Sequence, residues 1–273
     1  MTTAKQPSLF ITHGGGPCFW IEFPEPVRHG FDELRHHLEG LLDRLPERPR
    51  AIVVVSGHWE APVPTISTAT SPPMLFDYYG FPEHTYRLSY PAPGSPEIAM
   101  RVQTLLTEAG IAMATDAQRG FDHGVFVPFM IVDPEARIPV VMVSLQQDLD
   151  PAQHIAIGAA MAPLRDEGVL IVGSGSSYNN LRKFFADDRG ASSVFDDWLN
   201  ETVTAGDIAA RNRGLIAWRQ APNALDCHPR AEHLLPLMVA AGAAREDLGR
   251  RTFSARLGGK AVSCFAFGAF SPS

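Results

Sequence analysis

Three histidines lie where apolar segments begin or end, at positions far apart along the chain. His13 and His58 each come after an apolar run, and His233 lies at the start of a later apolar segment. Imidazole suits iron, zinc and copper, and two or three such ligands with open coordination positions make a catalytic site rather than a structural one. A histidine that only caps a strand is the alternative at each position. Because the pattern repeats, the sequence indicates a metal site assembled from three separate segments.

The run before His58 predicts a buried strand. Residues 51–60 begin with five apolar, mostly β-branched residues without polar alternation, which is typical of a parallel sheet covered on both faces. In open α/β sheets the carboxyl ends of such strands hold ligands, so His58 is expected where these folds keep their chemistry. Similar runs predict strands over residues 138–145, 168–174 and 261–270.

Apolar residues at three-to-four spacing predict a helix over residues 31–45. Two histidines of this segment, His36 and His37, fall on or beside its charged face. We expect both side chains to be solvated and to have no role in the site.

Strand and helix patterns alternate along the whole chain. Asp150 is a good N-cap for a helix over residues 151–167, because proline occupies the first helical position. Further helices are predicted over residues 96–109 and 196–211. No linker-like change in composition and no internal repeat interrupts the alternation. The sequence therefore predicts one three-layer α/β domain over residues 1–273, with a mainly parallel central sheet flanked by helices.

Composition narrows the class of protein. The 273 residues carry a net charge of -7, which argues against a nucleic-acid partner, since such proteins usually show a basic face. The three cysteines are scattered and do not form a disulfide framework, which favours a reducing compartment. No apolar run is long enough for a signal peptide or a membrane span. We therefore expect a soluble, cytoplasmic protein with no membrane partner.

Residues 61–96 are too long for an ordinary connection and are rich in proline and aromatic residues. Segments of this kind are often lids or binding loops. The rings of Tyr78, Tyr79, Phe81 and Tyr86 would suit a pocket for a flat aromatic ligand. The alternative is a loop that its own aromatic side chains hold in place.

Six short blocks of the sequence resemble, in the same order, the class III extradiol ring-cleavage dioxygenases, and most closely their DOPA-dioxygenase (LigB-like) branch. Together the blocks span nearly the whole chain. They are THGGGP around His13, VVVSGHWE around His58, YPAPGSP at residues 90–96, GFDHGVFVP around His123, GSGSSYNNLR around Asn179 and HPRAEHLLPL around His233.

The resemblance implies an α/β domain that holds one non-haem Fe(II), with zinc an alternative occupant of the same place. His13, His58 and His233 match the metal ligands of the family, and His123, which we place in a turn, matches a pocket histidine. Related subfamilies use a glutamate as third ligand, so Glu232 is the reserve candidate. The implied reaction opens a catechol-type aromatic ring with O2.

One position departs from the family pattern. The family has a histidine, the acid/base of its pocket, immediately before Asn-Leu-Arg, whereas this chain has Asn179. An amide does not transfer protons at neutral pH, although it can hydrogen-bond a phenol or a bound oxygen species. Either His123 or Tyr178 takes over the role, or the reaction differs, or turnover is poor.

Other functions are compatible with the same residues. A zinc hydrolase could use the same three histidines with an activated water, and a non-catalytic homologue could bind only a metal or ligand. The small-residue loop at 173–177 could bind phosphate, but it lacks the lysine of the P-loop pattern. Arg182 or Arg230 could pair with an acidic substrate. The oligomeric state is open, a homo-oligomer included.

Overall fold

β2 (Ala51–Ala61) lies near the centre of one eight-stranded sheet, whose order is β4-β3-β5-β2-β6-β1-β8-β7. The computed structural model describes residues 4–25, 27–186 and 190–272. β2 pairs in parallel with β5 on one side and with β6 on the other, and β6 pairs in parallel with β1. The other strands are β1 (Ser8–Thr12), β3 (Thr65–Ser67), β4 (Ala114–Asp116), β5 (Val140–Gln146), β6 (Val169–Gly175), β7 (Gly249–Leu257) and β8 (Lys260–Phe267).

The first half of β2 is buried throughout, as its apolar run predicts. Every residue from Ala51 to Val55 has at most 1% of its surface exposed, because parallel neighbours flank the strand and helices cover both faces. Among the described strands, the antiparallel pairs lie towards the two edges of the sheet, where β8 joins β1 and β7 and where β3 meets β5.

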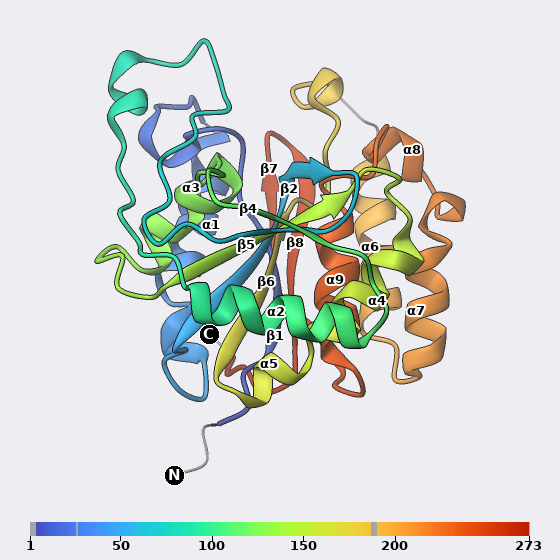
Figure 1. The fold of residues 1–273 in the computed structure, drawn as a ribbon. Helices are drawn as coiled ribbons and strands as arrows, with labels where there is room; N and C mark the ends of the chain where they lie inside the picture. Colours follow the sequence, from blue (N-terminus) through green and yellow to red (C-terminus); the bar gives the residue numbers. More distant parts are fainter. Residues whose placement is uncertain (1–3, 26, 187–189, 273) are drawn as a thin grey trace.

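Helices form the two outer layers (Figure 1). α9 packs against β6, β1 and β2, and α4 packs on α9, whereas α3 packs against β2 and contacts α1 on the other face. This arrangement confirms the predicted three-layer α/β fold. The helices are α1 (Val27–Glu39), α2 (Pro96–Glu108), α3 (His123–Val132), α4 (Pro151–Met161), α5 (Pro163–Asp166), α6 (Ala191–Val203), α7 (Ile208–Ile216), α8 (Ala224–Cys227) and α9 (Leu235–Ala244).

α9 is apolar on all sides, and each of its residues is buried. A helix of this kind needs apolar surroundings on every side, and α9 finds them between the sheet and α4. In the described ranges of the chain, every helix is too short or too polar to span a bilayer.

Three predicted helices have different ends in the structure. The segment 31–45 begins earlier, as α1, and the helix ends at Glu39 beside Gly40, a poor helix former. The segment 151–167 is divided into α4 and α5, because Pro163 has no N–H group to continue the hydrogen-bond ladder. The segment 196–211 is divided into α6 and α7, and Asp207 caps α7 by accepting from Ala209 N.

His37 is buried, so the prediction that it is solvated is wrong. The ring of Phe253, on β7, lies 5.0 Å from its ring, and Nδ1 of His37 accepts a hydrogen bond from Arg44 Nη1 at 3.0 Å. Burial, and then the Arg44 charge, lowers the pKa of His37 to about 4. The reason is tertiary: α1 packs on β7, which the sequence did not predict. His36 is exposed, as predicted.

The sequence did not predict β7, because β7 is an edge strand. Most of its residues are half-buried or exposed, so it has no apolar run to detect. The placement of His123 in a turn is also wrong, since this residue begins α3 and follows Asp122, whose carbonyl accepts from Phe126 N.

The aromatic-rich segment 61–96 is held down largely by its own rings. Tyr78 is buried, its hydroxyl donates to Thr85 O at 2.6 Å, and its ring lies 5.4 Å from Phe81 and 5.3 Å from Tyr86. Tyr79, in contrast, is 91% exposed. Of the four rings predicted to line a pocket, Tyr78 packs on Phe81 and Tyr86, whereas Tyr79 points to solvent.

Candidate metal centre

Four imidazoles converge near the carboxyl ends of the parallel strands. His58 Nε2 lies 3.2 Å from His13 Nε2 and 3.1 Å from His233 Nε2. The ring of His123 lies 3.9 Å from that of His58, and His13, His58 and His123 each offer a nitrogen within 4.8 Å of the others. The structure thus brings together the three histidines predicted as ligands and the histidine predicted for the pocket.

His58 lies within its strand rather than at the end of it. β2 continues to Ala61, and its register against β5 shifts between Val55 and Glu60. Irregularities of this kind often re-aim a side chain next to an active site. The bulged stretch turns His58 towards the end of β1, where His13 lies 4.9 Å away between ring centroids.

The carboxyl end of β6 ties the other two histidines together. His13 N donates to Gly175 O at 3.1 Å, and Ser176 N donates to His233 O at 2.9 Å. A Cβ atom on Gly175 would lie 2.1 Å from His233 O, so a larger residue would push away the turn that carries His233. This close approach is the reason for small residues in the GSGSS loop.

Each ligand candidate has an acceptor at Nδ1 that fixes the ring. His13 Nδ1 lies 3.0 Å from Ser174 Oγ, and this hydroxyl donates to Gly124 O, so it accepts from the imidazole. His233 Nδ1 lies 3.1 Å from Glu232 Oε1, and His58 Nδ1 lies 3.4 Å from a carboxylate oxygen of Asp77. With protons on Nδ1 of His13 and His58, the Nε2 lone pairs of these two rings face the cluster, as in metal sites whose histidines are oriented by outer hydrogen bonds.

Asp77 is a site residue that the sequence did not reveal. Its Oδ1 accepts from His123 N at 3.0 Å and from His123 Nδ1 at 2.8 Å, and its Oδ2 is the neighbour of His58. Burial alone would raise the pKa of Asp77, but the hydrogen bonds and charge of His123 outweigh it and hold the pKa below the usual value. Asp77 lies in an irregular loop, so no periodicity could have marked it.

The imidazole set fits a divalent cation. Burial, followed by the charges of the neighbouring histidines, holds the pKa of His13 and of His58 well below 6.5, so both rings are neutral. Neutral imidazoles are the form that binds a metal. Nitrogens around a tetrahedral zinc lie about 3.3 Å from one another, given Zn–N distances of about 2.0–2.1 Å. The two Nε2 separations at His58 are close to this value.

A buried polar network holds the backbone of His58. Ser56 Oγ accepts from His58 N at 3.2 Å and donates to Asp122 Oδ1 at 2.8 Å. Arg119 Nη2 donates to His58 O at 3.2 Å and to Asp122 Oδ2 at 2.7 Å. Burial, and then the charge of Asp77, raises the pKa of Asp122. These hydrogen bonds hold the backbone of the bulge at both the N–H and the carbonyl group of His58.

Asn179 occupies the outer side of His233. Its Nδ2 donates to Glu232 Oε1 at 2.9 Å and lies 2.7 Å from His233 Nδ1. The carboxylate of Glu232 is on this Nδ1 side, away from the Nε2 that faces His58. Hydrogen bonding from His233 overcomes the effect of burial and lowers the pKa of Glu232 to about 2. Glu232, the reserve ligand, thus contacts a ligand candidate rather than the nitrogens of the cluster.

Tyr178 and Asn179 line a cavity of about 40 Å³ together with His233. Tyr178 is 4% exposed, and its backbone is held by Ser176, whose hydroxyl donates to Tyr178 O at 2.7 Å. The structure therefore places both candidates from the GSGSSYNNLR block beside the third predicted ligand.

The two arginines considered for an acidic substrate differ in environment. Arg230 donates to both carboxylate oxygens of Glu60 and lies 3.3 Å from Glu232 Oε2, so acidic groups of the chain already neutralise it. Arg182 lies in a short 3-10 helix, Leu181–Lys183, and is exposed.

Residues 9–267 match the protein family described as the catalytic LigB subunit of aromatic ring-opening dioxygenase. The chain belongs to the LigB family. The family resemblance carried by the six sequence blocks is thereby confirmed, and the chain is an enzyme of the dioxygenase class with a three-histidine cluster suited to a metal.

Relatives within this group are similar over most of their length. A 4,5-DOPA dioxygenase extradiol of Beta vulgaris is 38% identical over 88% of this chain and 87% of its own. The dioxygenase tasH of Hapsidospora irregularis is 38% identical over 88% of this chain and 79% of its own. A 4,5-DOPA dioxygenase extradiol of Escherichia coli is 32% identical over 89% and 87%.

A solved structure is also similar to this chain. The crystal structure of an uncharacterized protein from Escherichia coli K12 has a TM-score of 0.77 and 27% identity, and the match covers 96% of this chain and 100% of that one. The fold therefore agrees with a neighbour over nearly its whole length.

Proposed function

We propose that this LigB-family chain is an extradiol dioxygenase that opens a catechol-type ring with O2 at a non-haem Fe(II) held by His13, His58 and His233. The observation that carries the proposal is the convergence of these imidazoles, whose Nε2 atoms lie 3.2 and 3.1 Å from that of His58. The names of the Beta vulgaris and Escherichia coli relatives support the same substrate class.

Bound Fe(II) would supply a Lewis-acidic, redox-active centre for both catechol oxygens and for O2. Zinc is the alternative occupant, because imidazole suits both metals. The three imidazoles add no negative charge, so the centre favours an anionic catecholate. The side chains of His13 and His58 stay neutral because they are buried, and they remain available as ligands across the neutral pH range.

His123 is the proposed acid/base. Asp77 holds its Nδ1 proton, so its Nε2 is the atom that can take a proton from the catechol and return it when the ring opens. The ring lies 3.9 Å from that of His58 and 5.5 Å from that of His13, which puts it within reach of a ligand at the cluster. Its side chain is 8% exposed, so bulk water has little access.

Asn179 and Tyr178 are proposed to shape the pocket rather than to move protons. The amide Nδ2 of Asn179 donates to Glu232 Oε1 and lies 2.7 Å from His233 Nδ1, so it helps to fix the third ligand candidate. Asn179 and His233 both line the cavity of about 40 Å³.

A second candidate function is metal or ligand binding without ring cleavage. The observation that favours it is the amide at the position of the family's acid/base histidine. A zinc hydrolase that uses the same three histidines is a third reading, but no feature of the site beyond the imidazoles favours it.

Anaerobic reconstitution with Fe(II), followed by a screen of catechols with an oxygen electrode, tests the proposal. We expect O2 consumption together with a yellow ring-opened product, and no consumption by the zinc-loaded chain. Full iron occupancy without O2 consumption on any catechol would contradict ring cleavage and favour the binding function. Zinc-dependent hydrolysis of an ester or amide would favour the hydrolase.

A further inference from the structure

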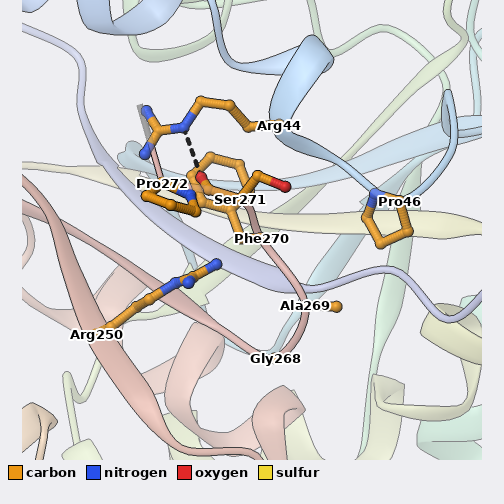
Figure 2. Close-up of a pocket in the computed structure, with 8 residues that line it drawn as sticks. All are labelled: Arg44, Pro46, Arg250, Gly268, Ala269, Phe270, Ser271 and Pro272. Atoms are coloured by element: carbon orange, nitrogen blue, oxygen red, sulfur yellow. Dashed lines mark hydrogen bonds between the residues drawn. The ribbon is translucent and has the colours of Figure 1, made fainter.

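A pocket of about 430 Å³ lies at the opposite end of the sheet from the histidine cluster. β8 runs antiparallel to β1 and ends with Phe267 opposite Ser8, the first residue of β1. The chain that follows, residues 268–272, therefore leaves the sheet at the amino end of β1, whereas His13 follows its carboxyl end. Figure 2 shows this segment with Arg44 on one side and Arg250 on the other.

The aromatic ring of Phe270 lies close to the guanidinium groups of both arginines. The Cζ of Arg44 lies 4.4 Å from the ring centroid of Phe270, and the Cζ of Arg250 lies 5.7 Å from the same centroid. Cations over an aromatic face are attracted to its electrons. The ring thus positions two positive charges at a single pocket, where they repel one another.

Arg44 is fixed by neutral partners only. Its side chain is buried, Nε donates to Ser271 O at 3.0 Å, and Nη1 donates to His37 Nδ1 at 3.0 Å. Burial, and then the charge of Arg250, lowers its pKa. Within the part of the chain that the structure describes, no carboxylate pairs with this guanidinium.

The guanidinium group of Arg250 has even fewer hydrogen-bond partners than that of Arg44. Its Nε and Nη2 are shielded from solvent and have no hydrogen-bond partner, and no acidic side chain among the described residues pairs with it. Guanidinium donors that are removed from water without an acceptor are unfavourable. Each guanidinium is a planar fork of donors that matches phosphate and carboxylate oxygens, and both of them line this pocket.

We propose that Arg44 and Arg250 form a binding site for the oxyanion group of a small molecule, a phosphate or a carboxylate. The pocket volume of about 430 Å³ is within the range of small-molecule sites, about 300–1,000 Å³. A neighbouring pocket of about 440 Å³ shares Arg44 and Pro272 with it and offers room for the rest of the ligand over Phe253. The site is separate from the histidine cluster and does not depend on the proposed ring cleavage.

Isothermal titration of the full chain with inorganic phosphate and with succinate tests this site. Arg250→Gln is the main variant, because the Nε and Nη2 atoms of Arg250 have no hydrogen-bond partner in the described structure, so the loss of its side chain should not prevent folding. Arg250→Met is the second variant, since it keeps an apolar contact with Phe270. Arg137→Gln is the matched control, because Arg137 is exposed and already paired with Glu135 at 3.0 Å.

We expect one anion per chain in the wild type and in the Arg137 variant. Affinity should fall at least about tenfold in both Arg250 variants, as for the loss of a charge-assisted hydrogen bond. Tighter binding of phosphate than of succinate would identify a phosphate-bearing ligand, and the reverse a carboxylate-bearing one. Anion binding that is unchanged in both Arg250 variants, including binding at the histidine cluster, would overturn the proposal, as would the absence of binding to the wild type.

A thermal shift provides a second readout. At a tenfold excess of anion over its Kd, the melting temperature of the wild type should rise by about 3 °C. The Arg250 variants should show no rise, while a rise of equal size in all chains would mean a general salt effect and overturn the site.

Discussion

Asp77 accepts two hydrogen bonds from His123 on a single oxygen, one from the backbone N–H at 3.0 Å and one from Nδ1 at 2.8 Å. Its second oxygen lies 3.4 Å from His58 Nδ1. One carboxylate from the aromatic-rich loop therefore orients two imidazoles of the cluster. The loop is joined to the metal centre through this residue, which gives the long connection a role in organising the site.

Asp77→Asn should weaken metal binding without unfolding the chain. The amide oxygen can still accept from His123, but the amide carries no charge, and its NH2 group cannot accept from His58 Nδ1. Loss of a group that hydrogen-bonds to a metal-binding histidine typically lowers metal affinity about 10- to 100-fold. Titration of Co(II) against a competing chelator measures the change.

Asp43→Asn is the matched control for this experiment, since Asp43 is exposed and lies in the short 3-10 helix before β2. Its metal affinity should equal that of the wild type. An Asp77→Asn chain that binds Co(II) as tightly as the control would show that the carboxylate does not orient the cluster.

Asn179→His should increase the rate of catechol cleavage. It restores the residue that the family has immediately before Asn-Leu-Arg, and a positioned acid/base contributes about 10²–10⁴-fold to a rate. The substitution also removes the hydrogen bond from Asn179 to Glu232, so the gain should be near the lower end of this range. Initial rates of O2 uptake on a catechol provide the measurement.

Asn179→Gln keeps an amide and serves as the control for Asn179→His. If the histidine variant is no faster than the glutamine variant, the pocket has been rebuilt around the amide for a different substrate, and loss of the histidine does not limit turnover.

His228 makes the stability of the fold depend on pH. It is fully buried between the rings of Phe195 and Trp218, and burial lowers its pKa to about 4. Because the unfolded state binds a proton at a pKa of about 6.5, stability from this group is complete above that pH and is lost as the pH falls towards 4. Its share of the free energy of unfolding should fall by about 2 kcal/mol between about pH 7 and pH 5.

Urea unfolding of the wild type and of His228→Gln at the two pH values measures this share. The glutamine can replace the hydrogen bond to Ser177 O but does not titrate. The wild type should lose more stability than the variant on acidification. Equal losses would show that His228 does not contribute to the pH dependence.

The positions of His13 and His58 could be predicted because both follow apolar runs whose burial in a parallel sheet depends on local composition. Neither the bulge around His58 nor the strand order could be predicted in this way, since both depend on pairing between distant segments. His233 could be predicted as a ligand candidate from its place before an apolar segment, and the family resemblance supported the same assignment. It lies in a turn, where periodicity carries no information.

Residues whose environment depends on contacts between distant segments were either not predicted or predicted in the wrong environment. Asp77 belongs to an irregular loop, and only its contacts with His123 and His58 reveal its role. His37 was predicted to be solvated because the helix pattern places it on or beside the charged face of its helix. The strand that buries it, β7, lies more than 200 residues later in the chain, so the local sequence gives no sign of the contact. An edge strand with few buried residues gives no sign of the surface that it covers.

Metal content of the His233→Ala and His123→Ala chains, after anaerobic reconstitution with Fe(II) and desalting, tests the central claim most directly. The claim assigns His233 as a ligand and His123 as an acid/base, although both rings lie beside His58. We expect about one iron per chain in the wild type and in His123→Ala, and little iron in His233→Ala. Full iron in His233→Ala together with its loss in His123→Ala would contradict the claim and make His123 the third ligand.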